Sequence, residues 1–181
     1  MPSTRRGFGL LALSLLTLPL LPATALAHGP TRQKVVEEIN INAAPAAVWK
    51  LVGDWNNWSA WHPAIDSSTA TAGNEVGSVR TLKLKGGGEL VEEIEGYDAE
   101  SMTLRYRAKD GGALPVTNYT SRVIVKAADG GGSTVTWWGA FYRGFPNNDP
   151  PPELNDEAAV AAVTGVYKTG LANLKAVAEK K

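Results

Sequence analysis

The feature that most constrains the fold is an amphipathic stretch near the C-terminal end of the chain, residues 155–177. Its apolar side chains recur at steps of three and four residues, which is the spacing of one buried stripe on an α-helix. They are Val160, Val163, Tyr167, Leu171 and Leu174. Asn155 is a good N-cap, because its side chain can accept a hydrogen bond from an amide of the first turn. Gly165 and Gly170 each cost roughly 1 kcal/mol relative to alanine in an exposed helix, so we expect a sheet or a ligand close to them.

Most of the chain before this helix is predicted to form strands. Runs rich in β-branched and aromatic residues, separated by turn residues, indicate strands at 33–41, 79–85, 89–97, 101–108, 119–126 and 133–142. Pro45 fits the first position of a short helix. A second short helix is expected at 55–61, where three tryptophans stand three residues apart, and it should end before Pro63. These elements predict an α+β domain in which a curved antiparallel sheet wraps around the long C-terminal helix.

The first 27 residues have the pattern of a signal peptide. Arg5 and Arg6 form a basic start, an apolar run follows, and Ala25-Leu26-Ala27 is a small-x-small cleavage site. The apolar run is too short and too broken by proline for a membrane span of about 20 residues. The segment therefore predicts export to a bacterial periplasm, by either the general secretory or the twin-arginine route. A single domain, 28–181, would remain.

The composition of the expected mature chain excludes several classes of function. Without Arg5 and Arg6, 16 basic residues stand against 18 acidic ones, so there is no electrostatic footprint for nucleic acid or an anionic membrane. The chain contains no cysteine, which excludes thiol catalysis, thiolate metal sites and iron–sulfur clusters. We expect no cofactor.

The order of elements resembles the helix-grip fold of the START-like, Bet v 1-like (SRPBCC, polyketide cyclase/dehydrase) superfamily. The strings that carry the resemblance, in order, are residues 42–49, 61–63, 80–82, 88–93 and 170–175. A narrower likeness to the periplasmic MxaD-like branch rests on residues 28–30, 142–144 and 154–160. The resemblance implies a small hydrophobic ligand bound between sheet and helix. It also implies an accessory role beside a periplasmic quinoprotein alcohol dehydrogenase or its cytochrome.

Strand alternation places two charged side chains on the inner face of the sheet. Arg80 shares a face with Leu82 and Leu84, and Glu92 shares one with Leu90 and Ile94. If the hairpin closes on the glycines at 86–88, the opposed pairs are Leu84 with Leu90, Leu82 with Glu92, and Arg80 with Ile94. Arg80 and Glu92 then lie diagonally within reach of each other. Because a carboxylate facing an apolar interior needs a partner, we predict an ion pair in the cavity, which either serves function or only satisfies itself.

The same alternation predicts an apolar lining that carries a few polar groups. The candidate ligand-binding residues, besides Arg80 and Glu92, are Tyr106, Tyr119, Trp137, Phe141, Trp61 and His62. Such a lining suits a small hydrophobic ligand held by a few polar contacts. The alternative is a dry core that side chains fill completely.

Each of the two histidines offers one hypothesis. His62 lies where the pocket mouth is expected and could act as an acid or base, or simply pin a loop. His28, as the new N-terminus, could chelate copper through its amine and imidazole, but the brace needs a second histidine. We predict no metal site on any other residue.

Two alternative functions compete with that of a ligand-binding accessory protein. A polyketide cyclase or aromatase would use Arg80 and Tyr106 to stabilise enolate charge, with Glu92 or His62 moving protons. A protein-interaction module would instead dock through exposed tryptophans at 55–61.

Overall fold

A computed structural model describes residues 29–180 of the chain. Within them, seven strands form one sheet: β1 (Gln33–Ile41), β2 (Ile65–Ala70), β3 (Val79–Leu84), β4 (Glu89–Asp98), β5 (Thr103–Ala108), β6 (Val116–Ala127) and β7 (Ser133–Arg143). The α-helices are α1 (Pro45–Val52) and α2 (Asp156–Ala178). Three short 3₁₀ helices of one turn each are also present in this range: η1 (Trp58–Ala60), η2 (Asp129–Gly131) and η3 (Pro152–Leu154).

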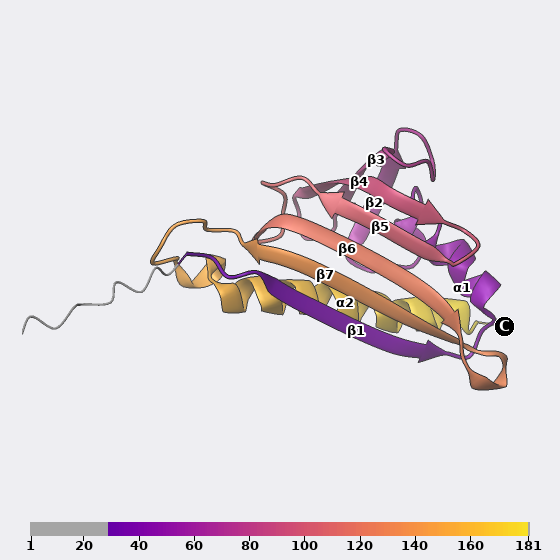
Figure 1. Cartoon of the computed structure of the whole chain (residues 1–181). Helices are drawn as coiled ribbons and strands as arrows, with labels where there is room; N and C mark the ends of the chain where they lie inside the picture. Colours follow the sequence, from indigo (N-terminus) through magenta and orange to yellow (C-terminus); the bar gives the residue numbers. More distant parts are fainter. Residues whose placement is uncertain (1–28, 181) are drawn as a thin grey trace, which may run out of the picture.

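The strands pair antiparallel throughout, in the order β1-β7-β6-β5-β4-β3-β2. Because β1 returns to pair with β7, the first and last strands lie side by side at one edge of the sheet. Figure 1 shows α2 running along β1 and β7 on one face of the sheet. Helix α1 packs against α2, β6 and β7, and η1 packs against β2. This is the predicted helix-grip architecture.

The predicted features of α2 are confirmed. The Asn155 side chain accepts a 2.7 Å hydrogen bond from the Ala158 amide, which satisfies one of the free donors of the first turn. Four members of the predicted stripe are buried, namely Val163, Tyr167, Leu171 and Leu174, and Val160 is partly buried. The stripe therefore packs onto the sheet, and the helix gains most of its stability from this contact.

Two predictions about local structure were wrong. Strand β2 was missed because its sequence, IDSSTA, lacks apolar alternation; pairing with β3 makes it a strand. The second short helix is only η1, and the three tryptophans do not share a helical face. The indole of Trp58 donates to the Val52 carbonyl at 2.9 Å, and that of Trp61 donates to the Leu51 carbonyl at 3.0 Å. These bonds hold the segment against the end of α1 with only one turn of 3₁₀ helix.

The predicted register of the β3–β4 hairpin was wrong by two residues. Arg80 lies directly opposite Glu92, and Leu82 lies opposite Leu90. The turn is displaced by one residue toward the N-terminus: the Leu84 amide donates to the Gly88 carbonyl, so Gly88 pairs with β3 and Lys85 takes its place in the loop. A slip of two residues keeps every side chain on its face, so the expected ion pair survives the error.

The two glycines of α2 have different surroundings. The predicted close neighbour is present at Gly170 and absent at Gly165. A Cβ atom at position 170 would lie 2.5 Å from Cδ2 of His62 and 3.0 Å from Cζ3 of Trp137. At position 165 nothing lies within 4 Å of such an atom. Gly170 thus permits the close approach of His62 to the helix, whereas Gly165 has no such role.

These surroundings predict opposite effects for the same substitution. Gly170→Ala is expected to lower the free energy of unfolding by about 2 kcal/mol, because overpacking outweighs the gain in helix propensity. Gly165→Ala is expected to raise it by about 0.5–1 kcal/mol, through the smaller entropy of the unfolded chain. Urea denaturation of both variants measures the difference. Effects of the same sign would contradict the packing described here.

Candidate functional site

A buried ion pair joins β3 to β4 inside the fold. Arg80 Nε donates a 2.8 Å hydrogen bond to Glu92 Oε2, and Nη2 lies 2.6 Å from the same oxygen, outside hydrogen-bond geometry. The side chain of Arg80 is 0% exposed and that of Glu92 is 5% exposed. The predicted pair is therefore confirmed, with both charges removed from bulk water.

Arg80 is enclosed by aromatic rings as well as by its carboxylate. Its Cζ atom lies 3.5 Å from the ring centroid of Trp55 and 3.8 Å from that of Trp58, on β3's inner side. Nη1 also donates to the Trp55 carbonyl at 3.3 Å. Stacking between two indoles stabilises a desolvated guanidinium. The arginine is thus a structural centre around which the 55–61 segment packs.

The environment of the pair acts on both pKa values. Burial raises the pKa of the Glu92 carboxyl, and the charge of Arg80 opposes that rise. Burial likewise lowers the pKa of Arg80, and Glu92 opposes that fall. Because arginine keeps its proton in proteins, its permanent charge stabilises the ionised form of the carboxyl. Glu92 is consequently an acceptor of hydrogen bonds and not a donor.

His62 pins its loop to α2. Its Nδ1 accepts a bond from the Ala64 amide at 3.3 Å, which leaves the proton on Nε2, and Nε2 donates to the Val166 carbonyl at 3.2 Å. Burial lowers the pKa of His62 to about 4, and the positive charge of Arg80 adds to this effect. A neutral ring with both nitrogens engaged fits the loop-pinning hypothesis better than acid–base chemistry.

This pKa predicts a pH dependence of stability. The unfolded chain takes up a proton at His62 below about pH 6.5, whereas the folded protein does so only near pH 4, so stability falls as the pH drops through this window. Between pH 7 and pH 5 the expected loss is about 2 kcal/mol. Urea denaturation at both pH values measures it. His62→Gln should remove this part of the slope, and an unchanged slope would show that another group titrates.

A chain of hydrogen bonds among hydroxyl groups lies between the sheet and α2. The hydroxyl oxygens of Tyr119 and Tyr167 are 2.6 Å apart, and Tyr167 lies 3.2 Å from Ser121 Oγ. Ser121 donates its own proton to the Trp138 carbonyl at 2.9 Å, so the protons run from Tyr119 through Tyr167 to Ser121. Burial raises the pKa of both tyrosines well above the usual value. They are neutral, and their protons are used within the chain.

Tyr106 and Trp137 complete this polar cluster. The Trp137 indole donates to Ser121 at 2.9 Å and to the Tyr106 hydroxyl at 3.1 Å. Burial raises the pKa of Tyr106, while hydrogen bonding to Ser121 and Tyr119 opposes the rise. The ring of Trp137 stacks on that of Tyr167 at 4.3 Å between centroids. The helical stripe predicts Tyr167 as a core residue only, because residue spacing does not reveal what its hydroxyl group contacts.

A cavity of about 50 Å³ remains between this cluster, the ion pair and α2. Its lining is mostly apolar or aromatic: Trp58, His62, Ala64, Ile65, Leu82, Leu84, Leu90, Glu92, Tyr106, Leu114, Tyr119, Trp137 and Val166. Sites for drug-sized ligands measure about 300–1,000 Å³, so this cavity holds no more than one to two waters of about 30 Å³ each. The expected hollow exists, but large rings fill most of it.

The candidate site residues divide into three groups by position. Glu92, Tyr106, Tyr119, Trp137 and His62 line the cavity. Trp61 and Phe141 are buried in the surrounding core and do not line it. Arg80 is enclosed behind Glu92. The guanidinium is therefore not presented to a substrate, so Arg80 cannot stabilise an enolate as the cyclase hypothesis requires, and only Tyr106 of that pair lines the cavity.

The aromatic docking surface expected at 55–61 is absent from the described residues. Trp55, Trp58 and Trp61 are each at most 2% exposed, so their rings offer nothing to a partner. The three rings are buried because they pack around Arg80 and the Tyr106–Trp137 cluster. Indoles stabilise the cation and exclude water from it. The three-residue spacing of the tryptophans could not by itself distinguish buried rings from an exposed surface patch.

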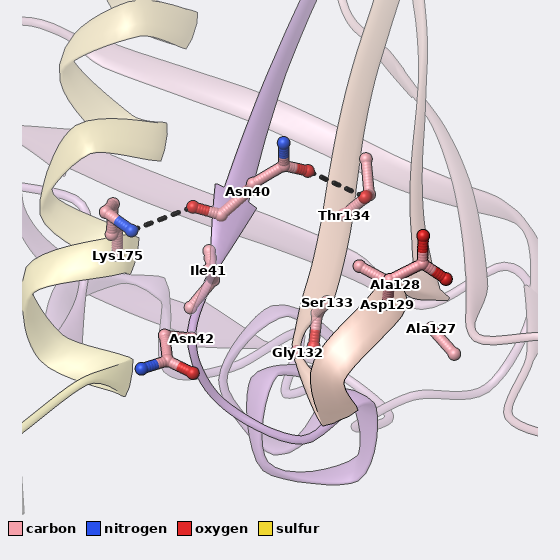
Figure 2. A pocket seen from close by; sticks show the side chains of 10 residues that line it. All are labelled: Asn40, Ile41, Asn42, Ala127, Ala128, Asp129, Gly132, Ser133, Thr134 and Lys175. Atoms are coloured by element: carbon pink, nitrogen blue, oxygen red, sulfur yellow. Dashed lines mark hydrogen bonds between the residues drawn. The ribbon is translucent and has the colours of Figure 1, made fainter.

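A wider hollow of about 610 Å³ shares no residue with the cavity. Figure 2 shows it between the end of β1, the β6–β7 turn and Lys175 of α2. Lys175 donates to the Asn40 carbonyl at 2.8 Å, and Thr134 donates to the Asn40 side chain at 2.8 Å. These polar groups bind one another across an open surface, so the hollow does not compete with the inner cavity as the site.

Within residues 29–180, no three histidine, aspartate or glutamate side chains converge as metal ligands. His28 lies outside the described residues, and its copper-chelating role stays a prediction. None of the helices in the same range is long and apolar enough to cross a membrane.

The fold and the cavity between the sheet and α2 define a Bet v 1-like helix-grip protein. Residues 32–179 match the family model described as polyketide cyclase / dehydrase and lipid transport. The chain belongs to this family.

Several solved structures have a similar fold. Protein XoxI from Bacillus cereus is 30% identical, with 80% of this chain and 94% of that chain covered and a TM-score of 0.68. An uncharacterized protein from Bacillus thuringiensis is 29% identical over 82% of this chain and 100% of that chain, with a TM-score of 0.69. The Zhui aromatase/cyclase from Streptomyces sp. R1128 shares the fold at 14% identity, 82% and 94% coverage and a TM-score of 0.69. No curated protein matches the sequence.

Proposed function

We propose that this protein is an exported binding protein that holds a small, mostly apolar molecule in the cavity between the sheet and α2. The observation that carries the proposal is the composition of the cavity. Among the described lining residues, Glu92 is the one ionised side chain, and it is set in an apolar and aromatic surface. Such a lining is typical of small-molecule sites. A ligand larger than the 50 Å³ space requires the side chains at the mouth to move outward.

We infer an accessory role in alcohol oxidation rather than catalysis. The engaged nitrogens of His62 and the enclosed guanidinium of Arg80 leave no matched acid–base pair at the cavity. The sequence resemblance to the MxaD-like branch supports a place beside a quinoprotein dehydrogenase or its cytochrome, and the 30% identity with XoxI agrees with it. Export rests on the signal-peptide pattern of residues 1–27.

Native mass spectrometry of the protein purified from a periplasmic fraction tests this function. We expect the mass of residues 28–181 plus a small bound molecule that is lost on denaturation. The full-length mass in the cytoplasm would refute export, and a ligand-free protein that takes up no apolar probe would refute binding. For the accessory role, the purified protein is added to a quinoprotein alcohol dehydrogenase and its cytochrome. An unchanged rate of cytochrome reduction would contradict that role.

A further inference from the structure

We propose that the cavity selects a ligand by a neutral hydroxyl group that donates a hydrogen bond to Glu92. This rests on the proposed binding function and deepens it by naming the class of ligand: a small alcohol rather than a carboxylic acid, a ketone or an amine.

The inference comes from following the partner of each polar group at the cavity. The indoles of Trp58 and Trp137 donate within the protein, and both nitrogens of His62 are engaged. Tyr119 donates into the hydroxyl chain, whereas Tyr106 accepts from Trp137 and no described residue accepts its own O–H. Apart from this hydroxyl group, the lining donors are therefore used within the protein.

Glu92 differs from these groups. Arg80 occupies its Oε2 atom, whereas no described residue donates a hydrogen bond to Oε1. The side chain keeps 5% exposure and lines the cavity, so this oxygen is open to a bound molecule. A carboxylate oxygen withdrawn from water needs a donor, and here only the contents of the cavity can supply one.

The charge of the ion pair restricts the donor to a neutral group. An anionic group of a ligand would be repelled by the Glu92 carboxylate and could not reach the guanidinium, because the indoles of Trp55 and Trp58 cover it. A cationic head would lose its hydration beside a carboxylate that Arg80 has already neutralised. A hydroxyl group donates without carrying charge, and it is small enough for a cavity of about 50 Å³.

The rest of the ligand has an apolar path toward the surface. Leu82 and Ile65 are buried beside the carboxylate, while Leu84, Leu114 and Val166 are partly exposed and mark the mouth. An alcohol would therefore bind with its hydroxyl group inward and its carbon atoms toward these side chains.

Four probes of nearly equal shape test the inference on the unmodified protein: 2-propanol, acetone, acetate and isopropylammonium. Titrations followed by the indole NMR signals of Trp58 and Trp137 should give 2-propanol a dissociation constant on the order of millimolar, as suits so few atoms. Acetone should bind at least about tenfold more weakly, because it cannot donate to the carboxylate. Acetate and isopropylammonium should not bind.

The outcomes separate this inference from the proposed function. If acetone or acetate binds as tightly as 2-propanol, the hydroxyl selection is overturned while binding stands. If none of the four binds, both fail. The double variant Arg80→Met, Glu92→Leu should bind 2-propanol and acetone alike, whereas the double variant Arg107→Met, Glu95→Leu, which removes an exposed pair of β4 and β5, should keep the preference. Retained preference in the first variant would overturn the role of Glu92.

Discussion

Replacing Arg80 with methionine is expected to lower the free energy of unfolding by about 3–5 kcal/mol, because it leaves the Glu92 carboxylate buried without its partner. The loss includes the stacking of the guanidinium between Trp55 and Trp58. Domains of this size are stable by only about 5–15 kcal/mol, so the variant should melt far below the wild type. Urea denaturation at neutral pH measures the change.

Adding Glu92→Leu to Arg80→Met should restore most of the lost free energy of unfolding. Arg80→Met combined with Glu92→Leu removes both charges, and a buried pair exchanged for apolar groups is often neutral or stabilising. The exposed pair of Arg107 and Glu95 is the matched control, since its loss should cost about 0–1 kcal/mol. A double variant as unstable as Arg80→Met alone would show that the two charges are not coupled.

Truncating Trp58 to alanine is expected to cost about 3–5 kcal/mol and to enlarge the cavity. The ring contacts Trp137 and Tyr106 edge-on, and its indole N–H satisfies the Val52 carbonyl. All of these contacts disappear with the side chain. The void left behind has the shape of an indole and is bordered by the Arg80 guanidinium and by aromatic rings, so free indole should bind it and raise the melting temperature of the variant.

Trp138 provides the control for this rescue. It lies one residue beyond Trp137 on the other face of β7 and is partly exposed, with Arg122 5.9 Å from its ring. Trp138→Ala should therefore lose far less stability and gain nothing from indole. If indole stabilises both variants equally, it binds elsewhere, and Trp58 does not control the space at the site.

The size of the cavity bears on how this family member works. A space of about 50 Å³ is far smaller than a lipid requires, although the family is described by polyketide cyclases and lipid transport. The rings of Trp58, Trp137 and Tyr167 occupy the volume that a larger ligand would need. This chain thus combines the family fold with an interior suited to a small molecule.

Much of the fold follows from local rules. Interactions between neighbours in the sequence determine the stripe and cap of α2, the strand β1 and the helix that starts at Pro45. The structure confirms all of them. Strand β2 depends instead on the edge that β3 offers, so its sequence carries no sign of it. The tryptophan segment likewise takes its conformation from Arg80 and from the carbonyls at the end of α1.

The sequence by itself determined that Arg80 and Glu92 face inward, because strand alternation has a period of two and an even error in register leaves it unchanged. Only the tertiary structure decided which of the two charges meets the cavity and how much space lies beside it. Both depend on rings that arrive from η1, β5, β7 and α2, whose summed volumes are defined only once distant segments pack together.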